Sequence, residues 1–205
     1  MSKIKINKTP RPYLSWSQLS LLEKSEYEYV KCYIYGEGTP VNPLLCLGKE
    51  LAEALEFDLE NIPEDIEIAR ILIPKFEKKE FKLEGRVDDI PIVGILDGFD
   101  EKDLVIHEIK TGTYNYQQKD ADKHGQLTFY SLLVYLNYGK LPNKIYLYHI
   151  PSRFEDGNFK LKSEIRIFET KRTMKDILDI TKRIKRAWKR IQELYESEIQ
   201  NGNVK

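Results

Sequence analysis

The chain has 205 residues, with 33 basic and 33 acidic side chains, so its formal net charge is zero and a globally basic, histone-like binder is excluded. Apolar residues make up 41% and charged residues 32%, which is enough apolar material for a real core and too much for a disordered chain. The two cysteines, Cys32 and Cys46, exclude a disulfide framework and any four-thiolate zinc or iron–sulfur site. No apolar run is long enough for a transmembrane helix, and no secretory signal follows the basic N-terminus. We therefore expect a soluble cytoplasmic protein, in the host cytoplasm if it is viral, with no membrane partner.

The N-terminal part predicts an arm and two helices. Residues 1–14 are basic and extended, because two prolines oppose a helix there. Ser15 and Gln18 have the spacing of a capping box, and the apolar residues behind them predict a helix to about residue 34. A second helix is expected over about 44–58. Two prolines punctuate the acidic segment after it, where no element is predicted.

The middle of the chain changes to a period of two, which indicates strands with one buried face. We expect strands over 81–87, 90–96 and 104–110, the second of which ends at Asp97. The short polar turns between them predict an antiparallel meander. A helix is then expected over about 123–138, where a glycine ends it.

The C-terminal part predicts two more strands, over 144–150 and 159–169, and a long helix from Thr173. The sequence shows no internal repeat and no low-complexity linker. This order of elements predicts one α/β domain over residues 1–205, with a mixed central β-sheet flanked by helices.

The C-terminal helix, within residues 171–200, is basic and amphipathic. Residues 171–190 contain nine Lys or Arg and two acids. Together with the basic arm, this helix could form a phosphate-binding surface, because its basic face lacks acidic partners at i,i+4 spacing. The alternative is the solvated face of an amphipathic helix. The candidate nucleic-acid-binding residues are Lys182, Arg183, Lys185, Arg186, Lys189 and Arg190.

Three charged residues around the second turn of the meander form a candidate site. Glu108 and Lys110 are two apart in one strand, so they project from the same face of the sheet. Asp97 can lie close to Glu108 if the two strands are hairpin neighbours. Two carboxylates and a backbone carbonyl would form a hard oxygen site for Mg²⁺ or Mn²⁺, and the lysine could orient a water or stabilise charge at a phosphate. The alternative is a turn residue beside a solvated strand face.

Five short motifs, in order, resemble the RecB-like branch of the PD-(D/E)XK nuclease superfamily. G-I-L-D at residues 94–97 is followed after ten residues by E-I-K-T-G at 108–112 and then by Q-L-T-F-Y at 126–130. They are similar to the G-x-x-D strand end, the D/E-x-K-T-G strand and the Q-L-x-x-Y helix of that branch. L-S-W-S-Q-L at 14–19 and G-K-E-L-A-E-A-L-E at 48–56 resemble its two earlier helical motifs.

The resemblance implies a restriction-endonuclease-like core with the active site on a strongly bent hairpin. It also implies a Mg²⁺- or Mn²⁺-dependent deoxyribonuclease. Asp97 and Glu108 would be metal ligands, with the carbonyl of Ile109 completing the set, and Lys110 would be the catalytic lysine. Gln126 and Tyr130 would support the site or contact the DNA backbone, and helix packing is the alternative role for both.

Two departures from the family pattern bear on the metal. The family's helix histidine, often a metal ligand, falls on Ala52, and Glu53 or Glu50 could replace it; the alternative is a solvated acidic helix. Many relatives bind an iron–sulfur cluster with four cysteines, and no such cluster is expected here. Both thiols are expected to pack against helices. His107 and His149 are expected to pack within strands. His124 is expected at a helix surface or against a phosphate.

The favoured prediction is a metal-dependent DNA nuclease that hydrolyses phosphodiester bonds in recombination, repair or viral genome processing. Whether it is an exonuclease or an endonuclease is left open, as are its oligomeric state and a helicase or recombination protein as partner. One alternative is a catalytically weak or inactive DNA-binding module on the same fold. Another is a dimeric structure-selective endonuclease, such as a junction resolvase.

Overall fold

The computed structural model describes residues 9–38, 42–57 and 59–202, so most of the predicted basic arm lies outside the described residues. In this part of the chain a six-stranded sheet has the order β1-β2-β3-β4-β5, with β6 paired to β4. β3 and β4 are parallel, because the chain between them crosses over through helices, and the other pairs are antiparallel. The strands are β1 (Lys78–Val87), β2 (Ile90–Asp100), β3 (Val105–Gly112), β4 (Lys144–Glu155), β5 (Asn158–Leu161) and β6 (Arg166–Thr170).

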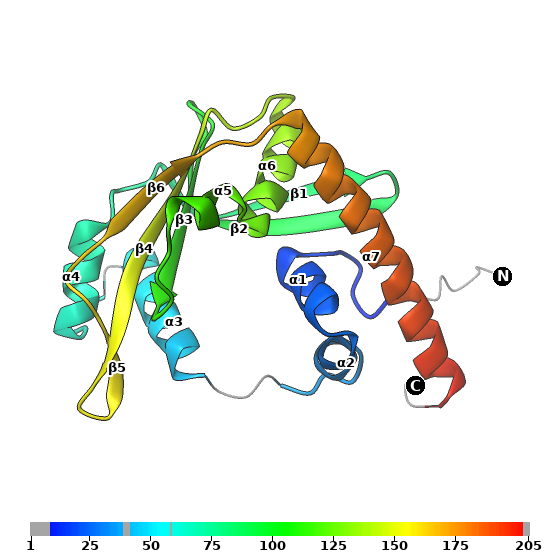
Figure 1. Ribbon diagram of the computed structural model, residues 1–205, viewed down its shortest axis with the longest axis horizontal. Coiled ribbons are helices and arrows are strands. Elements are labelled where there is room, and N and C mark those ends of the chain that lie inside the picture. The colour runs from blue at the N-terminus through cyan, green and yellow to red at the C-terminus, as the bar shows by residue number, and fades with distance from the viewer. Residues whose placement is uncertain (1–8, 39–41, 58, 203–205) are drawn as a thin grey trace.

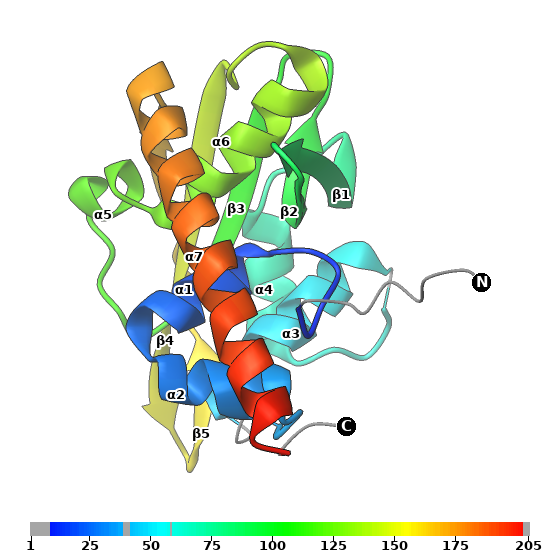
Figure 2. The same cartoon turned by 90° about the vertical axis from the view of Figure 1, so that its right-hand side faces the viewer.

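Helices cover both faces of this sheet (Figures 1 and 2). On one face lie α1 (Trp16–Lys24), α6 (Gly125–Tyr138) and α7 (Met174–Gln200), around a core that includes Leu96 and Ile106. On the other face, α3 (Pro43–Glu56) and α4 (Glu64–Leu72) pack around a second core, which includes Leu51 and Ile150. α3, α4 and α7 each bury one apolar stripe, whereas α6 is buried on most of its surface, between the sheet and α7. The predicted fold class, a mixed sheet flanked by helices, is confirmed.

The first predicted helix is interrupted, although its helical residues end at Ile34, as expected. The break lies at Ser25, whose extended backbone ends α1. The Ser25 hydroxyl then accepts the Glu28 N–H at 3.2 Å and caps a short helix, α2 (Glu26–Tyr29), which continues into a π-helical turn, η1 (Val30–Ile34). The apolar periodicity runs through the break, so it could not reveal this local competition between the serine side chain and the backbone.

Three further elements differ from the prediction. Pro63 and Pro74 lie just outside α4, where their missing N–H groups remove no helical hydrogen bond, and acidic residues in its first turn favour the helix. A short helix, α5 (Gln118–Asp122), precedes α6 and is capped by Gln117 and Asp120. The last predicted strand is two strands, since β5 forms a hairpin with β4 and β6 returns to pair with an earlier part of β4.

The hairpin of β1 and β2 is interrupted at one pair. Lys79 pairs with Gly98 and Phe81 pairs with Leu96, whereas the residues between them, Glu80 and Asp97, lie opposite one another without pairing. Glu80 has a left-handed backbone, with φ of 44°. The side-chain alternation of β2 breaks at the same place, because Leu96 and Phe99, three residues apart, belong to the same core.

β2 and β3 separate next to this interruption. They pair from Asp100 back to Gly98, which lies opposite His107, and the next residues in this register are Asp97 and Glu108. Beyond that point Leu14, fully buried, occupies the free side of β2: its N–H donates to the Pro91 carbonyl at 2.9 Å and its carbonyl accepts the Val93 N–H at 3.0 Å. The separation of the two strands therefore begins at two of the predicted site residues.

Candidate active site

Asp97 lies in the fork between β2 and β3. Its Oδ2 atom accepts the Ile109 N–H at 2.6 Å, so the carboxylate takes the hydrogen bond that a continued strand ladder would have made. This contact holds the Asp97 side chain against the backbone of β3. The fork thus brings Asp97 next to the strand that carries Glu108 and Lys110, as the hairpin argument predicted.

The other predicted site residues form a chain of polar contacts from β3 to α6. Lys110 Nζ contacts a carboxylate oxygen of Glu108 and donates to Gln126 Oε1 at 2.8 Å. Gln126 Nε2 in turn donates to the Tyr130 hydroxyl at 2.8 Å. Gln126 and Tyr130 lie one helical turn apart on the face of α6 that covers the sheet. The predicted common face of Glu108 and Lys110 is confirmed.

The site buries two carboxyl groups beside one ammonium group. Glu108 is 1% exposed, and burial, followed by the nearby Asp97 carboxylate, raises its pKa to about 8. Burial also raises the pKa of Asp97, against the opposing effects of Lys110 and the Ile109 N–H. Burial lowers the pKa of Lys110, but Glu108 and Asp97 outweigh it, so the pKa is raised and the lysine keeps its charge. One ammonium therefore faces two carboxylates.

A cavity of about 460 Å³ opens beside the fork, between α3, α4 and the first three strands. Asp97 and Ile109 line it, and so does Ala52, the residue in the place of the family's helix histidine. Glu50 and Glu53, the predicted substitutes for that histidine, are exposed on α3 and are not among the lining residues. The structure therefore does not bring either of these two carboxylates to Asp97.

The cavity has three other acidic residues that the sequence reasoning missed: Glu56 at the end of α3, Glu67 on α4, which pairs with Arg70, and Glu80 on β1. A signal for Glu80 was present. The turn at Asp88 and Asp89 joins Val87 to Ile90, and counting back along both strands from this pair places Glu80 opposite Asp97. The prediction started the strand at residue 81 and so excluded it.

A family model described as the PD-(D/E)XK nuclease superfamily matches residues 45–203. The chain belongs to this superfamily. A candidate exonuclease from Eubacterium rectale has the same fold, at 13% identity and a TM-score of 0.61 over 97% of this chain and 87% of that one. A phage-related exonuclease from Haemophilus somnus 129PT aligns at 15% identity and 0.55, over 85% and 81% of the two chains. No curated protein sequence matches.

PD-(D/E)XK nucleases generally use divalent metals, and the donor atoms here suit such an ion. Carboxylate oxygens are hard ligands, and Glu108 Oε2 is buried without a hydrogen-bond partner in the described structure. Within that part of the chain, no three Asp, Glu, His or Cys side chains converge closely enough to hold a metal ion.

The predicted phosphate-binding face of α7 is largely neutralised. Arg183 contacts Glu23 at 2.5 Å, Arg190 contacts Glu26 at 2.7 Å, and Lys185 contacts Asp88 at 2.6 Å. Lys182 pairs with Asp179, Lys189 lies 3.9 Å from Glu193, and Arg186 lines a groove between α1 and α7. The expectation that this face lacks acidic partners is wrong, because most of them come from segments distant in sequence.

No described helix is long and apolar enough to cross a membrane.

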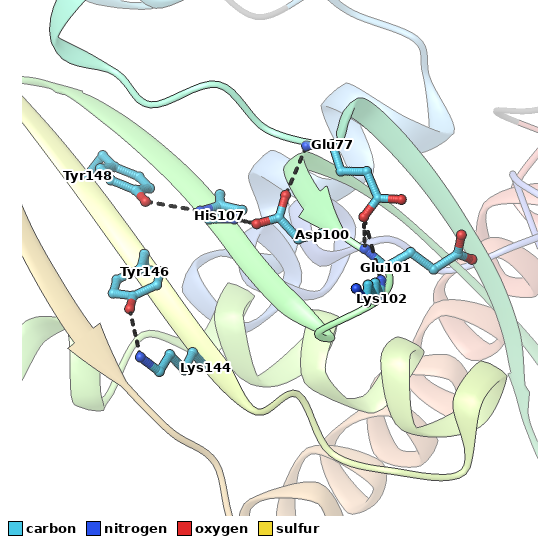
Figure 3. Close-up of polar contacts among 8 residues, drawn as sticks. All are labelled: Glu77, Asp100, Glu101, Lys102, His107, Lys144, Tyr146 and Tyr148. Carbon is cyan, nitrogen blue, oxygen red and sulfur yellow. Dashed lines mark hydrogen bonds and ion pairs between the residues drawn. The ribbon is translucent and has the colours of Figure 1, made fainter.

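His107 packs in β3 as predicted and also makes hydrogen bonds that were not predicted (Figure 3). Its Nε2 atom lies 2.9 Å from Asp100 Oδ2 and its Nδ1 atom 3.0 Å from the Tyr148 hydroxyl. Asp100 also accepts the Glu77 N–H at 2.8 Å, so the group ties the segment before β1 to the end of β2. Burial lowers the pKa of His107 despite Asp100. These contacts fix the closed end of the β2–β3 hairpin.

The remaining histidines and the cysteines were partly predicted. His149 is fully buried, as expected. His124 lies at the N-terminus of α6, as expected, where it is the cap residue, but it is half-buried rather than fully at the surface. Cys32 is half-buried, whereas Cys46 is exposed and does not pack as expected. Two cysteines in these states offer no iron–sulfur site.

His124 should make the stability of the protein depend on pH. Burial, then Lys110 and Arg172, lower its pKa from 6.5 to about 4. The folded state therefore favours the neutral ring, and the resulting stability is present above about pH 6.5 and is lost as the pH falls towards about 4. Urea unfolding in EDTA should show that wild type loses about 1–2 kcal/mol more than His124→Asn between pH 7 and pH 4.5. Equal losses in the two proteins would contradict this assignment.

Proposed function

We propose that the chain is a Mg²⁺- or Mn²⁺-dependent deoxyribonuclease of the RecB-like branch. The observation that carries this proposal is the placement of Asp97 and Glu108 at the fork between β2 and β3, with Lys110 in contact with Glu108. Membership of a nuclease superfamily and the exonuclease folds support hydrolysis of a nucleic acid. DNA processing in recombination, repair or viral genome processing fits such an enzyme.

The residues divide the reaction between them. Asp97 and Glu108, with the Ile109 carbonyl, would hold the ion, and the ion would polarise the scissile phosphate and lower the pKa of a bound water. Lys110 places its ammonium group beside Glu108, where it stabilises negative charge that develops on the phosphate. Gln126 holds Lys110 in position through its side-chain oxygen, and Tyr130 holds Gln126. All three groups of the motif are present, which favours an enzyme over an inactive binding module.

A cleavage assay tests this proposal. End-labelled single-stranded DNA, linear duplex and closed circular duplex are incubated with the full chain and Mg²⁺, Mn²⁺ or EDTA. We expect cleavage with either ion, none in EDTA, and loss of the activity in Glu108→Gln, which rules out a contaminating nuclease. Cleavage of the circle would identify an endonuclease. A dimeric mass in solution, together with selective cleavage of branched DNA, would identify a resolvase. Salt-sensitive binding without cleavage under any condition would overturn the enzyme in favour of the binding module.

A further inference from the structure

Glu80 lies at the one interrupted pair of the β1–β2 hairpin. Its neighbours in β1 pair with β2 on both sides, and Glu80 itself faces Asp97 across the break. The two residues are close enough for the charge of Asp97 to act on the Glu80 carboxylate. Both residues also line the cavity next to the fork. The position of Glu80 is therefore set by the register of the hairpin.

Glu80 adds negative charge that the described residues do not neutralise. It forms no hydrogen bond and no ion pair with any of them, unlike its neighbour Lys79, which donates to the Leu55 carbonyl. The Glu80 residue is exposed to solvent, yet partial burial of its carboxylate, then Asp97 and Glu56, raise its pKa, which reports the crowding of like charges. A cation bound beside these carboxylates would offset their mutual repulsion.

A second observation points to a ligand at the same place. Glu108 is 1% exposed, and only one of its two carboxylate oxygens contacts Lys110. The other, Oε2, has no partner among the described residues. Leaving a buried carboxylate oxygen without a partner is costly, and it is explained when an ion or an ordered water completes its contacts.

We propose that Glu80 is a third carboxylate of the ion site and accepts hydrogen bonds from water molecules of a divalent ion that Asp97 and Glu108 hold directly. This inference rests on the proposed function, since it assigns a further residue to the same ion. An outer role agrees with the finding that no three acidic side chains converge as ligands in the described residues. Substitution of a residue that hydrogen-bonds to the groups around a metal ion commonly lowers metal affinity by about ten- to a hundredfold.

Ion binding without DNA tests the inference. Mn²⁺ is titrated into the full chain, the free ion is measured by electron paramagnetic resonance, and the heat of binding is measured by calorimetry. Glu80→Gln is expected to raise the Kd by about tenfold. The matched control is Glu84→Gln, an exposed glutamate of the same strand that pairs with Lys82, and its Kd should stay within about twofold of wild type. In EDTA the melting temperature of Glu80→Gln should be no lower than that of wild type, because one of several like charges is removed.

The outcomes separate this inference from the function on which it rests. If the wild-type protein binds the ion clearly and Glu80→Gln binds it with the same Kd, only the role of Glu80 is overturned. If Glu53→Gln raises the Kd and Glu80→Gln does not, the role of Glu80 is overturned and belongs to Glu53, on α3. Failure of wild type to bind the ion would overturn the metal site as a whole. If Glu80→Gln does not fold, Glu80→Asn is used, because asparagine tolerates the left-handed backbone at this position.

Discussion

Lys110→Met is expected to slow DNA cleavage by roughly a hundredfold to a thousandfold while Mn²⁺ binding is retained. The ammonium group lies between Glu108 and Gln126 in a half-buried position, where charge stabilisation is stronger than in water. Methionine has a similar length but no charge, so it removes the interaction with the developing phosphate charge and leaves both carboxylates in place. The measurement is the single-turnover rate with saturating enzyme and Mg²⁺, which separates chemistry from product release.

Lys82→Met provides a matched control for this loss. Lys82 is also a strand lysine that contacts a glutamate two residues away, Glu84, but it is well exposed to solvent. Its substitution should change the cleavage rate by less than about twofold and the free energy of unfolding by no more than about 1 kcal/mol. A Lys110→Met enzyme that cleaves within tenfold of wild type would show that Lys110 is not the catalytic lysine.

Gly94→Val is expected to destabilise the fold by roughly 2–4 kcal/mol and to disturb the site at the same time. A Cβ atom at Gly94 would lie 2.6 Å from Leu133 Cδ1 and 2.8 Å from Tyr130 Cε1, both on α6. No real Cβ contact is this short, so the Leu133 and Tyr130 side chains of α6 must shift away from β2. Because Tyr130 holds Gln126, and Gln126 holds Lys110, this movement should also lower the cleavage rate. The close packing of α6 on β2 thus explains why the first residue of the G-x-x-D motif is glycine.

The unfolding energy of Gly94→Val can be compared with that of Gly38→Val. A Cβ atom at Gly38 would meet nothing within 4 Å, so this change should cost less than about 0.5 kcal/mol. Both proteins are unfolded in urea with tryptophan fluorescence as the signal. A midpoint for Gly94→Val equal to that of wild type would contradict the close packing of α6 on β2.

The core of the site was predictable because its causes are local. Glu108 and Lys110 share a face through strand alternation, and Asp97 lies near them through a short hairpin connection, so three residues within 14 positions determine the arrangement. Gln126 and Tyr130 were placed together by helical spacing, but their contact with Lys110 depends on how α6 crosses the sheet. Only the family resemblance pointed to that contact in advance.

Other features depended on contacts between distant segments. Acids of α1 and α2 neutralise α7 across more than 150 residues of sequence, which no i,i+4 rule can detect. The prediction placed a helix carboxylate in the role of the missing histidine by spacing alone, yet the rotation of α3 turns Ala52 to the cavity and leaves Glu53 exposed. Counting the strand register back from the turn could have placed Glu80 opposite Asp97. The prediction missed it because strand boundaries are the least certain part of such a prediction.

The hydrogen bond from the Ile109 N–H to Asp97 gives the site a natural spectroscopic reporter. Most amides of β3 are held by neighbouring strands, whereas this one depends on the side chain of Asp97, a proposed metal ligand. Any event that moves or protonates Asp97 will change the nitrogen and proton chemical shifts of this amide and its rate of exchange with deuterium. A single resonance, assigned in ¹⁵N-labelled protein, therefore follows the state of the carboxylate without a substrate, a label on the side chain or a substitution.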